Sequence, residues 1–383
     1  MDALIKLIAS TIDEKSPYTG KHCERVPEIA FMLARAAQKS DLPWLAEFKF
    51  KNKDQWREFE VAAWLHDCGK ITTPEHIVDK GTKLEMIYNR IHEIRMRYEV
   101  LLRDAQLAYW KKRAQGTEED FSLIKELEET QQRLHKEFAF IADCNIGGEF
   151  MDPERTDQLK TIRAQTWTRH FDNRLGLSHI EAEQYPETEQ PLPYQEQLLQ
   201  DRPEHILSRD PDRHKEDEKF GFNMPVPDLA HDQGELHNLT IARGTLTEED
   251  RYKIQEHITA TIRMLDILPF PADLAQVPEY AGAHHETLVG DGYPRKLTKE
   301  QISIPGRILA IADIFEALTA SDRPYKKAKP LGKVIQIMAG MRDRGHIDPE
   351  LFRVFLTSGV CMEYAKTFLR PEQAEDIDIT PFL

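Results

Sequence analysis

The sequence predicts an all-α fold, because apolar residues recur at intervals of three and four over most of its length and no strand-rich region is apparent. An early stripe consists of Val26, Ile29, Ala30, Leu33 and Ala36. Residues 56–66 form another helical run, which ends in His66–Asp67. Helical periodicity resumes near Leu246, where Thr247-x-x-Asp250 is a start signal, and continues to about residue 370.

The middle of the chain has a different pattern. Apolar residues alternate three and four apart in two runs separated by the polar turn RAQGTEED, which predicts an antiparallel helical hairpin with coiled-coil packing. The runs are Ile87, Ile91, Ile94, Tyr98, Leu101, Ala105 and Ala108, then Ile124, Leu127, Leu134, Phe138 and Ile141. Residues 156–184 favour another helix, and 186–227, with seven prolines, favour an irregular segment.

Composition and charge exclude several classes of protein. The 383 residues carry a formal charge of −15, which argues against DNA, RNA or anionic-membrane binding. No stretch approaches the roughly 18–20 apolar residues of a membrane span. The N-terminus meets acidic residues too early for a secretory signal. Four widely spaced cysteines form no CxxC pair, so we expect reduced thiols and a cytoplasmic location.

Five polar clusters could carry chemistry, although each alone has an ordinary structural explanation. They are His66–Asp67, His284–His285–Glu286, Asp313, His22 and His257. Asp313 is the most telling, because it interrupts an apolar run in which a lone buried carboxylate would be costly. Imidazoles and carboxylates without thiolates suit Fe, Mn, Ni or Zn at a catalytic centre. Two such ions bridged by an aspartate can act on a phosphate ester.

These clusters resemble the HD-GYP subgroup of the HD superfamily of metal-dependent phosphohydrolases. The resemblance rests on HDCGK (66–70), HHETLVGDGYP (284–294) and IADIFEALTASDRPYK (311–326), and it covers about 1–80 and 240–365. It implies an HD-type helical bundle, residues 1–84 and 241–383, interrupted by an inserted helical subdomain, 85–240. It also implies a bacterial enzyme of second-messenger signalling that hydrolyses cyclic di-GMP or 3′3′-cyclic GMP-AMP to the linear dinucleotide.

The resemblance implies roles for individual residues. His66, Asp67 and Asp313, with His22, would hold one divalent metal, and Asp67 would bridge to a second held by His257, His284 and His285. A hydroxide between the metals would attack, and Lys70 would neutralise charge on the phosphate. Arg323, Lys326 and Tyr293 would contact the dinucleotide, and the GYP loop could bind a diguanylate cyclase. Tyr18 replaces a glutamate that supports a third metal in some members, so we expect two metals.

Two alternatives stay open. His257 lies 191 residues after His66, far beyond the usual spacing, and His92 also follows HDCGK at a plausible distance. We favour His257, because it keeps the expected order before the HH pair, whereas His92 lies beside the heptad seam at Ile91. The alternative function is a non-catalytic receptor for cyclic dinucleotides or a scaffold for diguanylate cyclases. A missing ligand would favour it, but each ligand expected for two metals is present.

Overall fold

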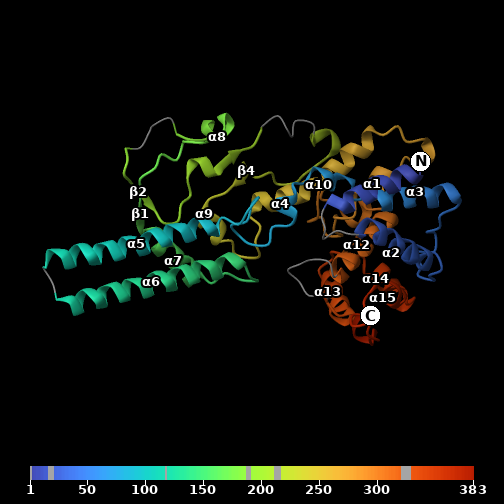
Figure 1. The fold of residues 1–383 in the computed structure, drawn as a ribbon. Helices are drawn as coiled ribbons and strands as arrows, with labels where there is room; N and C mark the ends of the chain where they lie inside the picture. The colour runs from blue at the N-terminus through green and yellow to red at the C-terminus, as the bar shows by residue number, and fades with distance from the viewer. Residues whose placement is uncertain (1, 16–20, 117–118, 187–190, 211–216, 321–328) are drawn as a thin grey trace. The chain divides into compact units, whose positions relative to one another are not determined.

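The computed structural model describes residues 2–15, 21–116, 119–186, 191–210, 217–320 and 329–383 (Figure 1). The chain forms two compact units: residues 1–79, 212–226 and 252–383 in the first, and 80–211 and 227–251 in the second. Most described residues are helical, so the all-α prediction is confirmed, with two small sheets in addition. Among the described helices, none has the length and apolarity that crossing a membrane requires.

The first unit is a bundle around α2, α3 and α12. Its helices are α1 (Asp2–Lys15), α2 (His22–Ala37), α3 (Lys53–Leu65), α4 (Glu75–Val78), α10 (Glu248–Ile267, from Tyr252 on), α11 (Val277–Gly282), α12 (Ile304–Thr319), α13 (Leu331–Asp343), α14 (Pro349–Thr357) and α15 (Val360–Phe368). Short 3-10 turns are η1 (Cys68–Thr72), η3 (Asp217–Phe220), η4 (Ala272–Leu274), η5 (Lys299–Gln301) and η6 (Thr380–Phe382). Leu33, Phe59 and Phe315 are fully buried in its core.

Local hydrogen bonds fix where the helices that matter for the site begin. The Asp13 carboxylate accepts from the backbone N–H of Cys23, at 3.1 and 3.2 Å, and so satisfies a free donor in the first turn of α2. At the predicted start of α10, Thr247 Oγ1 accepts from Asp250 N at 3.1 Å, and the Asp250 carboxylate accepts from Thr247 N at 3.2 Å. This reciprocal cap confirms the start signal read from the sequence.

The second unit contains a long helical hairpin and two small sheets. Its elements are α5 (Ile91–Gln115), α6 (Asp120–Ile146), α7 (Pro153–Arg163), β1 (Thr166–Arg169), α8 (His179–Glu183), β2 (Tyr194–Gln197), η2 (Pro203–His205), β3 (Ile206–Ser208), β4 (Leu229–Asp232) and α9 (Glu235–Leu239). Strand β1 pairs antiparallel with β2, and β3 with β4. The helix predicted over 156–184 is therefore wrong between Arg163 and His179, although its last part forms α8, and part of the segment predicted to be irregular forms strands.

The hairpin itself is confirmed, since α5 and α6 lie side by side (Figure 1). Two details of the predicted seam are wrong. Ile87 precedes the helix and is 91% exposed, because α5 begins only at Ile91, whose N–H is capped by Asn89 Oδ1 at 3.1 Å. On α6, Leu123 is buried and Ile124 is exposed, so the first turn packs one residue earlier than predicted.

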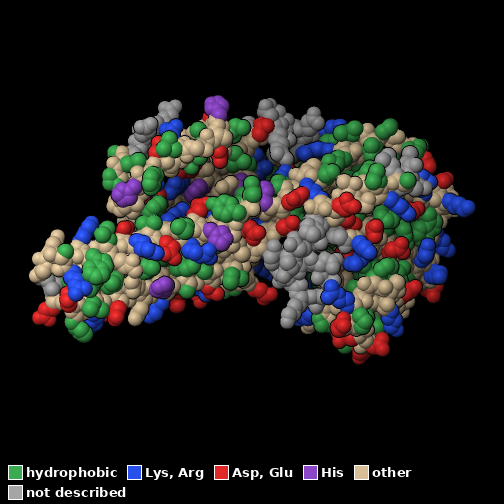
Figure 2. Space-filling model, viewed as in Figure 1, with side chains coloured by type: hydrophobic (Ala, Val, Ile, Leu, Met, Phe, Trp, Pro, Cys, Tyr) green, Lys and Arg blue, Asp and Glu red, His purple; other side chains and the backbone are tan. Residues whose placement is uncertain are grey.

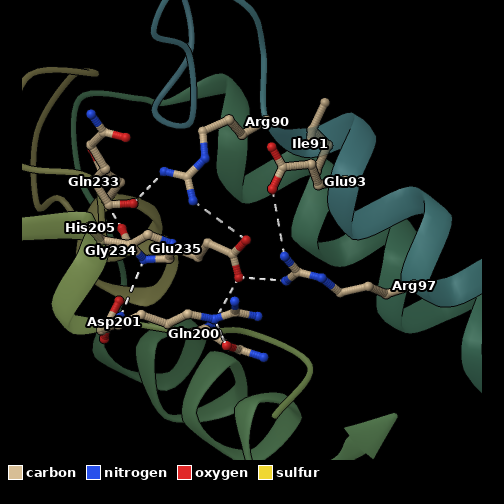
Figure 3. A network of polar contacts seen from close by, with 12 residues as sticks. Arg90, Ile91, Glu93, Arg97, Gln200, Asp201, His205, Gln233, Gly234 and Glu235 are labelled. Atoms are coloured by element: carbon tan, nitrogen blue, oxygen red, sulfur yellow. Dashed lines mark hydrogen bonds and ion pairs between the residues drawn. The ribbon is translucent and has the colours of Figure 1, made fainter. Parts of the chain in front are cut away.

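A buried ionic network joins the base of this hairpin to α9 (Figure 3). The Glu235 carboxylate, which is fully buried, accepts from Arg97 at 2.7 Å and from the backbone N–H of Gln200 at 2.8 Å. Arg90 lies 3.6 Å from the other carboxylate oxygen. Removing one partner of a buried charge pair leaves an uncompensated charge, so these residues tie the hairpin to the rest of the unit.

Candidate metal centre

Seven residues named from the sequence lie together in the first unit. His22 begins α2, His66–Asp67 follow α3, His257 lies on α10, His284–His285 follow α11, and Asp313 lies on α12. Their side chains form two groups, in each of which the ligand atoms lie within 4.8 Å of one another. The groups are His22, His66, Asp67 and Asp313, and Asp67, His257, His284 and His285. Asp67 is common to both.

The two carboxylate oxygens of Asp67 face different groups. Its Oδ2 lies 3.2 Å from the Nε2 atoms of both His22 and His66. Its Oδ1 lies 3.3 Å from His257 Nε2 and 3.9 Å from His284 Nε2. One carboxylate with an oxygen directed to each group is the arrangement that a bridging ligand between two ions requires.

Backbone carbonyls orient three of the imidazoles. The Nδ1 atoms of His66, His257 and His284 lie 2.8, 2.5 and 2.7 Å from the carbonyl oxygens of Ala63, Ile254 and Ala281. A proton on Nδ1 donated to the carbonyl leaves the Nε2 lone pair directed at the centre. The Nε2 atoms of His22, His66 and His284 are buried without a hydrogen-bond partner. Buried polar atoms are seldom left unsatisfied, so this donor set fits divalent ions.

Glu316 orients His22, and the sequence reading missed it. Its Oε2 lies 2.5 Å from His22 Nδ1, and its Oε1 lies 3.4 Å from Arg25. Glu316 follows Asp313 by three residues on α12, so both carboxylates lie on the same face of that helix. The sequence did contain a signal that could have identified Glu316, because it is a second acidic residue one turn after Asp313 in the same apolar run.

Burial and charge set the protonation of the ligands. Burial and the neighbouring His66 lower the pKa of His284 to about 4, and burial with His284 and His257 lowers that of His285 well below its usual value. Burial also lowers the pKa of His66, but the carboxylates of Asp67 and Asp313 together outweigh it and raise the value to about 9. Burial raises the pKa of Asp67, yet the charges nearby hold it well below its usual value. The ionised Asp67 beside the neutral imidazoles of His284 and His285 suits metal binding, whereas an ion in the first group would displace the proton of His66.

The HDCGK turn places a cation beside the shared carboxylate. Lys70 Nζ lies 2.5 Å from Asp67 Oδ2. The turn packs directly on α10, because Gly69 N donates to Thr261 Oγ1 at 2.8 Å. A Cβ at Gly69 would lie 2.0 Å from the carbonyl oxygen of His257, so only glycine permits this approach.

The GYP loop closes over the second group. The ring of Tyr293 stacks on that of His285, with centroids 4.7 Å apart and an interplanar angle of 19°. Tyr293 N donates to the His285 carbonyl at 3.2 Å. A Cβ at Gly292 would lie 2.5 Å from Thr287 N, which explains the glycine that precedes the tyrosine. The aromatic ring thus lies against a candidate metal ligand.

A segment that is distant from the GYP loop in sequence forms hydrogen bonds with this loop. Residues 217–226, which we call the strap, belong to the first unit. Asn223 N donates to the Pro294 carbonyl at 2.7 Å, and Arg295 Nε donates to the Phe220 carbonyl at 2.9 Å. Phe222 stacks on Phe220, with centroids 5.3 Å apart. The strap contacts were not predicted, because nothing local in a proline-rich stretch indicates its partner.

Four other residues were named in the sequence analysis, and only one of them, His92, is among the described residues. Arg323 and Lys326 fall outside the described residues, as does Tyr18. His92, the alternative ligand, lies exposed on α5 in the second unit, with its Nδ1 2.6 Å from Arg95. The second group of candidate ligands contains His257 instead.

Fold and site together place the His66–Asp67 pair within two groups of candidate metal ligands in a helical unit, and the chain can be compared with known proteins. Residues 193–351 match the family described as HD domain. The chain is 39% identical over 131 residues to 3′3′-cGAMP-specific phosphodiesterase 1 of Vibrio cholerae, covering 33% of this chain and 30% of that protein. It is 37% identical over 131 residues to a cyclic di-GMP phosphodiesterase of Pseudomonas aeruginosa, with the same coverage.

A cyclic di-GMP phosphodiesterase of Thermotoga maritima is 35% identical over 129 residues, covering 33% of this chain and 34% of that protein. The chain thus spans about a third of the length of these curated relatives. The predicted resemblance to the HD-GYP phosphodiesterases is confirmed by the family match and these relatives.

Proposed function

We propose that this chain is a metal-dependent phosphodiesterase that hydrolyses a cyclic dinucleotide, cyclic di-GMP or 3′3′-cyclic GMP-AMP, to the linear dinucleotide. The observation that carries the proposal is the shared carboxylate of Asp67, with one oxygen toward each group of candidate ligands. The relatives support the substrate class, since their names include both cyclic dinucleotides. Nothing among the described residues favours a non-catalytic receptor.

In this proposal two divalent ions, Fe, Mn, Ni or Zn, are held by the two groups. Such ions would supply an activated water and neutralise charge on the phosphate. The chain's own residues orient the site. Asp67 holds both groups in register, Glu316 fixes the ring of His22, and Lys70 offers its ammonium to the scissile phosphate. Tyr293 offers an aromatic face beside the second group, on which a base of the substrate can stack.

The remaining assignments extend the same proposal. Arg323 and Lys326 contact the dinucleotide, and the GYP loop is the surface for a diguanylate cyclase partner. Residues 1–84 and 241–383 form the catalytic part, and 85–240 form an insertion. The four cysteines are buried free thiols, which supports a cytoplasmic location.

The test is product analysis by chromatography. Protein of measured metal content is incubated separately with cyclic di-GMP and with 3′3′-cyclic GMP-AMP, beside the Asp67→Ala variant. We expect linear dinucleotide from at least one substrate. Asp67→Ala should lose turnover and metal while keeping its helical circular dichroism, because both groups lose a ligand. Near-normal turnover by Asp67→Ala would remove the two-metal proposal, and no product from either substrate would remove the activity.

A further inference from the structure

Helix α5 carries a second apolar stripe, on the face opposite its contact with α6. Its first stripe repeats every seven residues from Ile91 and packs on α6. If Ile91 is the first position of the repeat, the second stripe occupies the third and sixth positions. These positions lie on the side of α5 that faces away from α6. The second stripe consists of the apolar residues Met96, Val100, Leu107, Trp110 and Ala114, with the charged Arg103 between Val100 and Leu107, and these six positions are spaced four, three, four, three and four apart. Met96, Leu107 and Trp110 are 61%, 51% and 59% exposed.

The corresponding face of α6 is polar, so the stripe is not a general property of the hairpin. With the α6 repeat set by its buried residues Leu134 and Ile141, the outward positions are Ser122, Lys125, Glu129, Gln132, Lys136, Ala139 and Asp143, all exposed. Solvated helix faces normally look like this one. On the face visible in Figure 2, hydrophobic side chains lie exposed among the charged ones along the hairpin.

We propose that this stripe of α5 packs against the same stripe of a second copy of the chain, with the two helices antiparallel about a two-fold axis. A two-fold interface requires a self-complementary surface. Centred between Arg103 and Leu107, the antiparallel register sets Val100 opposite Trp110 of the partner subunit. It likewise sets Met96 opposite Ala114 of the partner subunit. A large residue thus meets a smaller one in these two layers, as dense packing requires.

Charge selects the antiparallel direction. A parallel pair would place Arg103 against its own copy in the seam, and would bring the basic run 111–113 against itself. Antiparallel packing separates these like charges and brings Glu99 beside Arg113 of the partner subunit. Flanking charges set orientation in coiled coils in this way. Arg103 meets Leu107 of the partner subunit, over which its aliphatic stem can lie while its charged end stays in water.

The contact is long enough to hold two chains. Met96 to Ala114 spans ~27 Å at the helical rise of about 1.5 Å per residue. A stable interface buries about 800 Å² on each partner. Over about five helical turns each helix contributes Trp110, Met96 and Leu107 as the large apolar side chains of such an interface. The second copy adds two further helices, so the paired hairpins form a four-helix assembly.

Mixed disulfide formation tests both the dimer and its direction. Val100→Cys and Trp110→Cys variants of the full chain are prepared separately, mixed in equal amounts and oxidised, with the parent as the control because its cysteines are buried. The antiparallel register predicts covalent dimers in the mixture but few in either variant alone, since like positions would lie ~15 Å apart along the axis. Covalent dimers in the single variants, or none in the mixture, would overturn the proposal.

Sedimentation velocity provides an independent measurement. We expect the parent chain to be a dimer and Leu107→Glu to be a monomer with unchanged helical circular dichroism. Gln132→Glu, on the outward face of α6, is the matched control and should remain a dimer. The proposal would also be overturned if the parent chain were monomeric at 100 times the concentration used in the turnover assay. It would likewise be overturned if the Leu107→Glu variant remained a dimer.

Discussion

The choice between His257 and His92 can be decided by one pair of variants. His257 is 2% exposed, and its Nε2 lies 3.3 Å from Asp67 Oδ1 and 3.1 Å from His285 Nε2. His257→Ala would remove one of the four candidate ligands of the second group. Losing a residue that merely supports a ligand costs about 10–100-fold in metal affinity. Losing a ligand should cost at least about 100-fold, or ~3 kcal/mol at about 1.4 kcal/mol per tenfold.

His92 provides the matched control, because it is exposed on a helix in the second unit. His92→Ala should change stability by less than about 0.5 kcal/mol, as surface substitutions usually do. Metal content by elemental analysis and dinucleotide turnover are measured side by side. We expect His257→Ala to lose one of two metals and nearly all hydrolysis, while His92→Ala resembles the parent. The reverse result would refute the assignment and would place the insertion after the ligand helix.

Variants at three further residues test other contacts. Lys70→Ala should keep its metals but lose on the order of 10²–10³ in rate, typical of one charge-stabilising group; loss of metal would contradict this. Asn223→Pro removes the N–H that donates to Pro294, whereas Asn223→Ala keeps it, so only the proline variant should raise KM at unchanged metal content. Burial and Arg90 lower the pKa of His205 to about 4. Its neutral form therefore stabilises the fold above pH 6.5, and up to about 3 kcal/mol is lost as pH falls toward 4. His205→Asn should flatten this loss in thermal melts at pH 4–7, and an unchanged slope would count against it.

The elements that the sequence predicted well are those with strong local signals. The start of α10 follows from Thr247 and Asp250, whose side chains cap each other's backbone. The hairpin follows from a seven-residue repeat that few other structures produce. Beyond Arg163 the periodicity is weak, and strand β1 exists because β2 pairs with it from 25 residues away or more. A partner so remote leaves no mark on the local pattern, so a helix was predicted there instead.

The candidate site, too, could be predicted from the sequence only in part. Seven residues were named from motifs, and the structure brings all seven into two groups. Their arrangement could not be read from the sequence, because it depends on which oxygen of Asp67 faces which ring. Glu316 and the strap were missed for a related reason. Each acts through contacts with a segment that is distant in sequence, which the local pattern around it does not reveal.

The length of chain between the two halves of the site also has a physical explanation. The entropic cost of closing a loop grows only by about 0.6 kcal/mol for each doubling of its length. The 191 residues from His66 to His257 are therefore a modest thermodynamic burden, especially when most of them fold as a compact unit. What cannot vary is the contact that closes the loop. Gly69 lies against the backbone of His257 and Thr261 with no room for a Cβ. That contact carries Asp67 and His257 to within 3.3 Å, whatever the chain between them contains.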